Sequence, residues 1–493
     1  MTTPLTAPAL AGLGTRVTVP SYDRSRVTTG IVHFGVGGFH RAHQAMYLDR
    51  LLEEGRATDW GICGVGTMPG DRRMAQVLRE QDGLYTLVVK HPDGSLDARV
   101  IGSITNYLYA PDDPEAVLAV MAAPTTRIVS LTITEGGYHF HPSTGELDPD
   151  DPALQADLRP GAAPGSVFGL VVEALARRRA SGTPAFTVMS CDNIQGNGEV
   201  AHRMITAFAR LKDADLADWI ETNVPFPSSM VDRITPVTTD ADRQRVAEEF
   251  GVEDAWPVMT ESFTQWVLED HFPQGRPPYE EVGVQLVDDV TPYELMKLRL
   301  LNASHQALCY LGYLAGYRFA HEVCQDPLFT DFLLGYMRRE GEPTLQPVPG
   351  VDLGRYEHQL IDRFANPEIR DTLARLCAES SDRIPKWLVP VIREQLAAGG
   401  PVERSALVVA SWARYAEGVD EQGRPIEVVD RLRDRLMAAA ERQREEPLAF
   451  LQDRSLFGDL ADQPRFVESY TRALDALHNL GARETLQAWS DLP

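Results

Sequence analysis

The stretch that decides the fold of the first half reads IVHFGVGGFHR and covers residues 31–41. Strand-forming residues lead into three glycines, Gly35, Gly37 and Gly38, and a helical pattern (40–55) follows them. A buried strand that turns on glycines into a helix is typical of dinucleotide-binding folds. In these folds the first glycine makes the tight turn, and the second lets the backbone approach a pyrophosphate. The pattern predicts a cofactor-binding turn, and a glycine turn that binds nothing is the alternative.

The three residues after the glycines depart from that pattern. A small residue at the third position normally allows close contact between helix and strand, but His40 occupies it, between Phe39 and Arg41. Phosphate binding at a helix N-terminus relies on free N–H groups and the helix dipole, so it needs no particular side chain. Arg41 would add a positive charge. We predict that Phe39, His40 and Arg41, at this helix N-terminus, bind the cofactor together with the glycines.

A second strand pattern, WGICGVG (60–66), is followed by TMPGDRRM. An acid just past the second strand can bond the ribose hydroxyls of the adenosine and disfavour a 2′-phosphate, and Asp71 occupies this place. Arg72 and Arg73 favour the opposite preference, because an arginine there can accept that phosphate. A solvated helix start is the alternative for all three residues. We expect NAD as the cofactor, with NADP as a weaker alternative.

Strands and helices alternate along the rest of the first half. The segments 84–90 and 97–104, joined through Asp93-Gly94, predict an antiparallel hairpin. Further strands are expected at 127–137 and 185–194, and helices at 113–123, at 165–180 and from about 198. This alternation predicts an α/β fold, with a doubly wound, mostly parallel sheet covered by helices on both faces.

The second half is predicted to be mainly α-helical. Helical periodicity covers the segments 292–316, 326–340, 354–380, 385–398, 403–417 and 425–441. We therefore predict a Rossmann-like NAD-binding domain at 1–286 and an α-helical substrate-binding and catalytic domain at 287–493.

Composition excludes several classes of partner. The 493 residues carry a formal net charge of −24, which repels phosphate backbones and anionic membranes. The five cysteines are scattered and form no C-x-x-C pair, which argues for a reducing compartment and against a structural zinc site. The first residues lack a secretory pattern, and no apolar run approaches the ~18 residues that span a bilayer. We expect a cytoplasmic protein without nucleic-acid or membrane partners.

The stretch TPYELMKLRLLNASH (291–305) is the strongest candidate for chemistry. At 100° per residue, Lys297, Asn302 and His305 fall within an arc of roughly 140° on an otherwise leucine-rich helix. Buried polar groups need partners, and desolvation pushes down the pKa of a lysine, as a lysine general base requires. The alternative is that these three side chains pack against a domain interface.

Taken together, these motifs resemble one enzyme family. GVGGFHRAHQA, SLTITEGGYH, SCDNIQGNG, VDRITP and TPYELMKLRLLNASH are similar, in order and over essentially the whole chain, to the polyol-specific long-chain dehydrogenases, the mannitol 2-dehydrogenase family. The resemblance implies a metal-free hydride transfer to NAD(P), with a lysine as general base and two asparagines that stabilise the oxyanion.

The resemblance assigns roles to individual residues. It implies Lys297 as the general base, Asn193 and Asn302 as the oxyanion pair, His305 as a histidine close to the substrate, and Asp232 as a substrate-contacting acid. A lysine in its neutral form can take the hydroxyl proton of an alcohol. Two side-chain amides can donate hydrogen bonds to the oxygen as it gains charge, a task that a zinc ion performs in other enzymes.

Three residues have weaker assignments. Arg375 and Arg383 lie where the family contributes cationic substrate contacts, although long charged side chains are usually solvated. Glu294, one turn before the lysine, would pass the proton onward or only complete a capping box with Thr291.

The expected activity is the NAD-dependent oxidation of a sugar alcohol to a ketose, with D-mannitol to D-fructose first. Alternatives are D-arabinitol or sorbitol oxidation, or reduction of a keto-uronate such as fructuronate or tagaturonate. A non-catalytic nucleotide-binding sensor is the alternative from a different class. We expect a monomer or a weak homo-oligomer.

Overall fold

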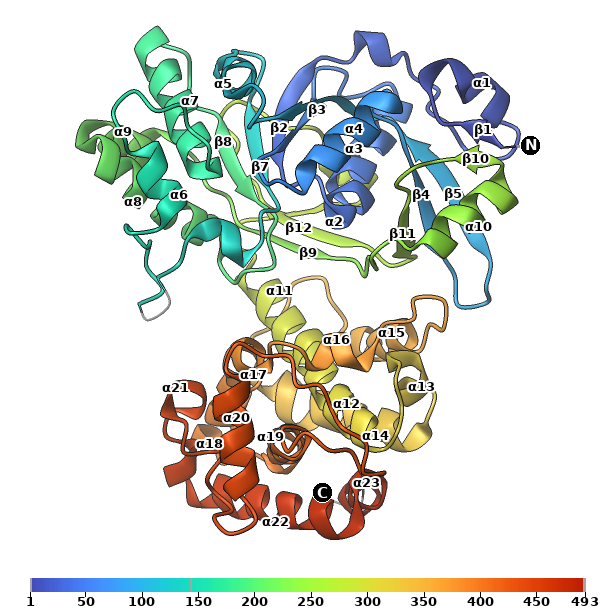
Figure 1. Ribbon diagram of the computed structural model, residues 1–493, viewed down its shortest axis with the longest axis vertical. Helices are drawn as coiled ribbons and strands as arrows, with labels where there is room; N and C mark the ends of the chain where they lie inside the picture. Colours follow the sequence, from blue (N-terminus) through green and yellow to red (C-terminus); the bar gives the residue numbers. More distant parts are fainter. Residues whose placement is uncertain (1, 142–143, 491–493) are drawn as a thin grey trace. The chain divides into compact units, whose positions relative to one another are not determined.

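The computed structural model describes residues 2–141 and 144–490 (Figure 1). The chain divides into two compact units, Met1–Val290 and Thr291–Pro493. Within the described residues, no helix is both long enough and apolar enough to cross a membrane. The five cysteines are buried and unpaired with one another.

A five-stranded parallel sheet forms the centre of the first unit, in the order β6-β3-β2-β7-β8. Its strands are β2 (Thr29–Phe34), β3 (Gly61–Gly66), β6 (Ile104–Tyr109), β7 (Ile128–Leu131) and β8 (Thr187–Ser190). The chain starts in the middle, extends to one side through β3 and β6, and then continues on the other side through β7 and β8. Ligands bind at the carboxyl ends of the strands where the order reverses, here between β2 and β7. The α/β prediction is confirmed.

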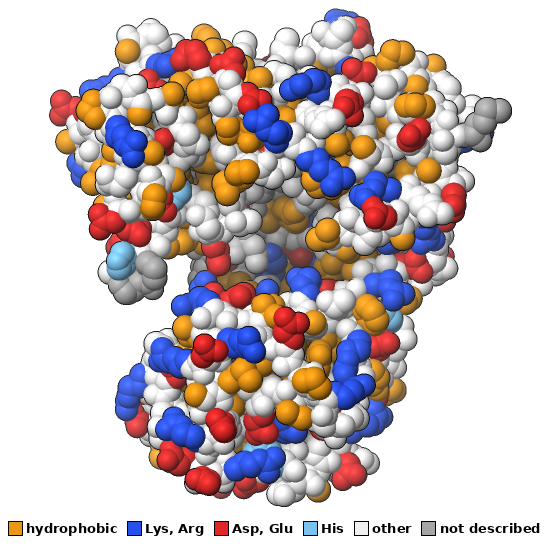
Figure 2. Space-filling view, viewed as in Figure 1, with side chains coloured by type: hydrophobic (Ala, Val, Ile, Leu, Met, Phe, Trp, Pro, Cys, Tyr) orange, Lys and Arg blue, Asp and Glu red, His pale blue; other side chains and the backbone are white. Residues whose placement is uncertain are grey.

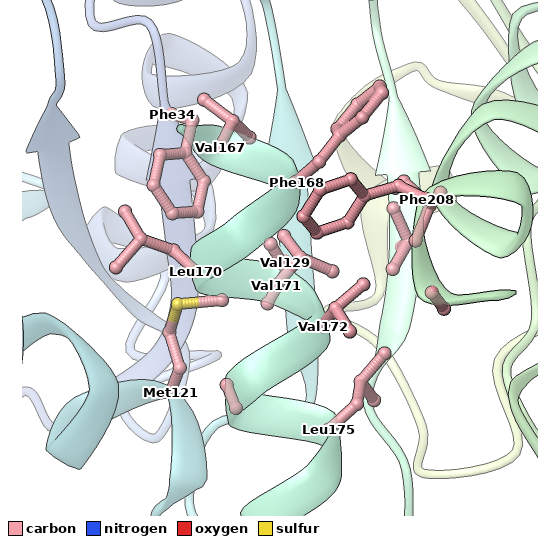
Figure 3. Packing of buried hydrophobic residues seen from close by; sticks show 14 of the residues in the cluster. Phe34, Met121, Val129, Val167, Phe168, Leu170, Val171, Val172, Leu175 and Phe208 are labelled. Atoms are coloured by element: carbon pink, nitrogen blue, oxygen red, sulfur yellow. The ribbon is translucent and has the colours of Figure 1, made fainter. Parts of the chain in front are cut away.

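Alternating side chains of the central strands enter two different cores. In β2, Val32 and Phe34 face one hydrophobic cluster, and Ile31 faces another, as the two-residue period of a strand requires. Helix α7 (Val167–Ser181) covers the first face: Figure 3 shows Leu170 near Phe34, both in one buried cluster. Helices α3 (Gln44–Glu53) and α4 (Asp71–Glu80) contribute to the second cluster. Both faces of the sheet are therefore covered.

Three smaller sheets complete the first unit, one of them the short parallel pair β1 (Thr3–Pro4) and β10 (Val252–Glu253). The predicted hairpin is confirmed, because β4 (Tyr85–Lys90) and β5 (Leu96–Ile101) pair antiparallel, and β11 (Val258–Glu261) joins them. The third sheet contains β9 (Ser229–Asp232), β12 (Gln265–Glu269) and β13 (Gln285–Val287). The strands that the sequence pattern did not predict are β1, β6, β9, β10, β11, β12 and β13. The strand predicted at 127–137 is shorter in the structure, because β7 ends at Leu131 and a 3₁₀ turn, Glu135–Tyr138, follows it.

The second unit is helical, as predicted, but several of the predicted segments differ from the structure. The segment 385–398 is interrupted at Leu388, between α17 (Ser380–Trp387) and α18 (Val389–Ala398), and the segment 425–441 is helical only from Arg433, where α20 (Arg433–Arg442) begins. The segment 354–380 is not one helix: α15 (Leu353–Phe364) and α16 (Leu373–Cys377) are separate. Pro367 lies between them, and proline lacks an N–H and disfavours helix at the preceding residue. The segment 292–316 consists of α11 (Thr291–Met296), a π-helical segment (Lys297–Asn302) and α12 (Ala303–Leu314). Helices α12, α14 (Pro327–Tyr336), α20 and α22 (Pro464–Leu480) pack against α19 (Glu403–Tyr415), whose residues are mostly buried.

Candidate functional site

The glycine turn has the backbone that a nucleotide-binding turn requires. Gly35 has φ +88°, and a Cβ there would lie 2.0 Å from the carbonyl oxygen of Thr132, so only glycine fits. Gly37 is exposed, and the nearest atom to a Cβ added there would be 3.9 Å away. Gly38 begins the short helix α2 (Gly38–Ala42). The first glycine therefore shapes the turn, and the second leaves open space for a ligand.

His40, at the unusual third position, is part of the helix–strand packing. Its ring is 1% exposed and lies flat on the ring of His33 in β2, with 3.4 Å between the ring centroids. His33 is fixed by Ser130 Oγ at 2.8 Å and Thr132 Oγ1 at 2.9 Å. Burial lowers the pKa of His40 well below its ordinary value, so both stacked rings can be neutral. A flat ring thus achieves the close contact that a small residue usually provides, and contact between His40 and a cofactor stays a prediction.

Arg41 is also buried, and its guanidinium contacts the protein backbone. It donates to the carbonyl oxygens of Trp256 at 2.5 Å and Gly37 at 3.3 Å. The rings of Tyr85 and Trp256 lie 5.2 and 5.7 Å away. Phe39 stacks on the ring of His43 with 4.9 Å between centroids. Arg41 therefore fastens the glycine turn to a distant loop, and a direct bond from Arg41 to a phosphate stays a prediction.

Asp71 is the first residue of α4 and holds the turn after β3. Its Oδ2 accepts hydrogen bonds from the backbone N–H groups of Thr67 and Met68, both at 2.9 Å. Arg72 forms an exposed ion pair with Asp112 at 2.8 Å, and the Arg73 guanidinium lies 4.9 Å from the ring centroid of Trp256. Both arginines already have contacts within the protein, so the arrangement favours a cofactor without a 2′-phosphate.

Asp192 organises the carboxyl ends of β7 and β8. Its Oδ1 accepts the N–H of Thr134 at 2.7 Å, and its Oδ2 accepts the hydroxyl of Tyr138 at 2.9 Å. Thr134 has φ +62° and ψ 171°, a region that is essentially restricted to glycine. Asn193 follows directly and is exposed. Asp192 was not predicted as a site residue, although an acid directly before the asparagine of SCDN is visible in the sequence.

Asn197, a second missed residue, links the motif SCDNIQGNG to VDRITP. Its side-chain amide donates to the carbonyl oxygens of Asp192 at 2.9 Å and Ser229 at 2.7 Å, and it accepts the N–H of Ser229 at 2.9 Å. Ser229 begins β9, which ends at the buried Asp232. The structure thus ties the turn that carries Asn193 to the strand that carries Asp232.

Lys297 and Asn302 are the first and last residues of the π-helical segment in the second unit. Both are buried, with exposures of 8% and 5%. In an α-helix, residues five apart point about 140° away from each other. A π turn pairs residue i with residue i+5, which brings Lys297 and Asn302 closer to one face. The prediction of one continuous α-helix was therefore wrong at the residues that matter most. Buried Asn302 Oδ1 has no hydrogen-bond partner among the described residues, so it is able to accept a hydrogen bond from a ligand.

The other predicted residues of this unit lie on neighbouring helices. His305, on α12, is half-buried and packs against Phe364 of α15, with 4.5 Å between ring centroids. Arg383, on α17 (Ser380–Trp387), donates to the carbonyl oxygen of Arg375 at 3.2 Å. Arg375 forms a bidentate pair with Asp371 at 2.6 and 2.5 Å.

Gln306 connects these helices to α12, which directly follows the π-helical segment. It lies on α12 and donates to the carbonyl oxygen of Leu376 at 3.3 Å, and Arg383 donates to the same oxygen at 2.9 Å. Glu294, on α11, is buried. Its two predicted roles, proton transfer and helix capping, stay predictions. Within the described residues, no three His, Cys, Asp or Glu side chains are grouped to hold a metal ion.

Family models match nearly the whole chain. The model described as the mannitol dehydrogenase Rossmann domain matches residues 29–281, and the model described as the mannitol dehydrogenase C-terminal domain matches residues 289–478. The mannitol 2-dehydrogenase of Phaeosphaeria nodorum is 50% identical over 478 residues, which cover 96% of this chain and 84% of that protein. The mannitol 2-dehydrogenase of Neosartorya fischeri is 48% identical over 490 residues, with coverage of 98% and 97%.

Two solved structures have the same fold. The Pseudomonas fluorescens mannitol 2-dehydrogenase, in a ternary complex with NAD and D-mannitol, matches with a TM-score of 0.89 at 46% identity and covers 100% of both chains. A D-sorbitol dehydrogenase in substrate-free form matches with a TM-score of 0.92 at 37% identity, covering 98% of this chain and 100% of that chain.

A Rossmann-type unit followed by a helical unit, shared with solved dehydrogenases at 46% and 37% identity, defines a two-domain dehydrogenase. The two matched family models and the high identity along the chain narrow this class further. The chain belongs to the mannitol dehydrogenase family. The resemblance seen in the sequence motifs is therefore confirmed.

Proposed function

We propose that this protein oxidises D-mannitol to D-fructose with NAD as the hydride acceptor. The observation that carries the proposal is the buried pair of Lys297 and Asn302 on the π-helical segment, in a chain of the mannitol dehydrogenase family. The chain is an NAD-dependent oxidoreductase that acts on polyols, in keeping with its Rossmann-type sheet and with a structural relative that binds NAD and D-mannitol.

In the proposed reaction, the chain's own side chains manage the proton and the developing charge. Lys297, as a neutral amine, takes the proton of the reacting hydroxyl. Asn193 and Asn302 donate hydrogen bonds to the oxygen as it gains negative charge, and such donors contribute most in the transition state. Bound NAD supplies the acceptor for the hydride. His305, Asp232 and Arg383 are proposed to bind the remaining hydroxyls of the polyol.

The arrangement of the arginines favours a neutral substrate over a keto-uronate. Arg375 already binds a carboxylate of the protein, because its Nε and Nη2 both contact Asp371. A substrate carboxylate would have to compete with Asp371 for this guanidinium. Sorbitol remains the strongest alternative substrate, since the D-sorbitol dehydrogenase structure is 37% identical, and D-arabinitol is the next.

The other expectations agree with the surface and the composition. The face shown in Figure 2 mixes acidic and basic side chains, and the chain as a whole carries a net charge of −24. Neither feature favours binding to nucleic acid. A cytoplasmic location and a monomeric or weakly oligomeric state complete the proposal.

Initial rates on a panel of substrates test the proposal. D-Mannitol, D-arabinitol and sorbitol are oxidised with NAD or NADP, and fructuronate is reduced with either reduced cofactor. We expect the highest kcat/KM for D-mannitol with NAD. A higher value for another polyol would reassign the substrate, and no turnover with any of them would favour the nucleotide-binding sensor.

A further inference from the structure

The π-helical segment Lys297–Asn302 needs support from outside its own helix. A π turn interrupts the regular ladder of α-helical hydrogen bonds and is rare except as a short bulge at functional sites. Backbone groups that lose their helical partner must find another one when they are buried. All six residues of this segment are buried, so its supporting contacts should be visible in the second unit.

Tyr336 supplies one of these contacts. It is the last residue of α14 (Pro327–Tyr336) and is fully buried. Its hydroxyl donates to the carbonyl oxygen of Arg299 at 3.0 Å. Arg299 lies in the middle of the π-helical segment, between Lys297 and Asn302. A side chain from another helix therefore satisfies a backbone acceptor inside the segment.

The side chain of Arg299 provides a second anchor. Its guanidinium donates to both carboxylate oxygens of Glu394 at 2.8 and 2.7 Å, and to the carbonyl oxygen of Thr344 at 2.5 Å. Such bidentate pairs fix geometry as well as charge. Glu394 belongs to α18 (Val389–Ala398). Arg299 is thus held at its carbonyl by one element and at its side chain by two others.

Gly341 closes the third side of the segment. A Cβ at this position would lie 2.9 Å from Leu300 Cδ2 and 3.3 Å from the carbonyl oxygen of Arg299. Gly341 ends a second π-helical segment, Met337–Gly341, which directly follows Tyr336. The backbone of that segment therefore packs tightly against the one that carries the lysine.

We propose that Tyr336 is a positioning residue of the catalytic site, and that the pair of Arg299 and Glu394 assists it. Its hydroxyl holds the π conformation, and this conformation brings Lys297 and Asn302 toward one face. The inference rests on the proposed catalytic roles of Lys297 and Asn302. It goes beyond them because it assigns Tyr336 a role through the backbone of Arg299 rather than through contact with substrate or cofactor.

The test compares Tyr336→Phe with Tyr470→Phe. Both tyrosines are fully buried in the second unit, but the hydroxyl of Tyr470 has no hydrogen-bond partner among the described residues. We expect Tyr336→Phe to lower kcat for D-mannitol by about 10- to 100-fold, since a small misplacement of a catalytic group has effects of this size. The Kd for NAD should change less than twofold, and Tyr470→Phe should keep its full kcat.

A kinetic isotope effect separates positioning from a general loss of stability. With D-mannitol deuterated at both C2 and C5, which are equivalent by symmetry, Tyr336→Phe should show a larger isotope effect on kcat than the unmodified enzyme, because the chemical step becomes slower. A preparation with a fraction of inactive protein would keep the isotope effect unchanged. Glu394→Gln, at a half-exposed position, should lower kcat and raise the isotope effect on kcat, each by a smaller amount than Tyr336→Phe does. It provides the test if Tyr336→Phe does not fold.

The outcomes distinguish this inference from the proposed function. If Lys297→Ala keeps its turnover, the assignment of the base fails. If Lys297→Ala is inactive while folded Tyr336→Phe retains more than half of kcat with an unchanged isotope effect, only the positioning role is wrong. Equal losses of kcat in Tyr336→Phe and Tyr470→Phe would also overturn the positioning role.

Discussion

Replacing Thr134 by glycine should stabilise the first unit. Thr134 has φ +62° and ψ 171°, and a residue other than glycine in this region carries about 1–3 kcal/mol of strain. Glycine removes that strain but loses more conformational freedom on folding, at a cost of roughly 0.5–1 kcal/mol. We therefore expect Thr134→Gly to raise the free energy of unfolding by about 1 kcal/mol.

Asp192 is the residue that holds Thr134 in the strained conformation. In Asp192→Asn one carboxylate oxygen becomes an NH₂ group. The hydroxyl of Tyr138 can turn to Ser190 Oγ at 2.7 Å, whereas the N–H of Thr134 loses its charged acceptor. Hydrogen bonds to charged groups contribute about 1.5–3 kcal/mol, against about 0.5–1.5 kcal/mol for neutral pairs. The threonine can then relax and shift the neighbouring Asn193, which should lower kcat. Glycine at position 134 keeps the same conformation without that bond, so the double variant should recover part of the lost kcat.

The assay needs four proteins and one control. Urea unfolding and initial rates with D-mannitol and NAD are measured for the unmodified enzyme, both single variants and the double variant. Ala57→Gly is the control, because Ala57 also has a positive φ, +57°, but precedes the amino end of β3. It should leave kcat unchanged. The reasoning is refuted if Thr134→Gly lowers the free energy of unfolding by more than 1 kcal/mol, or if the double variant is no more active than Asp192→Asn.

Four further measurements test the site and the fold. Lys297→Ala should lose most of its turnover and still bind NAD, since it removes only the proton acceptor; turnover above a few per cent at every pH would exclude Lys297 as the base. Asp71→Ser should raise activity with NADP relative to NAD, because it removes the repulsion of a 2′-phosphate near Arg72 and Arg73, and an unchanged ratio would place Asp71 away from the ribose. Activity should survive prolonged treatment with a strong chelator, whereas loss that zinc restores would contradict a metal-free mechanism. Burial raises the pKa of Glu340 from 4.5 to about 7, so the folded protein retains this proton at pH values where the unfolded chain has released it. The stability that this proton gives is fully present below about pH 4.5 and is lost as pH rises through 7. The free energy of unfolding of the enzyme, relative to that of Glu340→Gln, should therefore fall between pH 5 and 8 by up to about 3 kcal/mol, and parallel curves would contradict the shift.

The central fold could be predicted because its strands have the simplest pattern. β2 and β3 are apolar runs that end at glycines, and both faces of the sheet are covered, so nearly every residue in them is buried. β9 and β11 were missed for the opposite reason. They have four residues each and include Ser229, Asp232, Thr260 and Glu261, whose burial depends on partners far along the chain. Apolar periodicity contains no signal for such strands.

The candidate site was predictable in its residue types but not in its geometry. A lysine and an asparagine on a leucine-rich helix stand out in any sequence, whereas the π turn between them does not. Its conformation depends on Tyr336, which is 37 positions away from Arg299, and on the missing side chain of Gly341. The same holds for His40. Its place in the helix–strand contact depends on stacking with His33, and the glycine pattern alone could not indicate this.

Each unit orders its own share of the proposed catalytic residues. In the first unit, Asp192 and Asn197 fix the turn that carries Asn193 through hydrogen bonds to the turn after β7 and to β9. In the second unit, Tyr336 and Glu394 fix Arg299, between the lysine and the asparagine. Preorganised donors are effective because they do not have to reorient during the reaction. Because Asn193 and Asn302 are proposed to bind one oxyanion, the losses of transition-state stabilisation in Asp192→Asn and Tyr336→Phe should fall short of additive in the double variant, although the two hydrogen-bond networks lie in different units. Full additivity would mean that the two networks act on separate atoms.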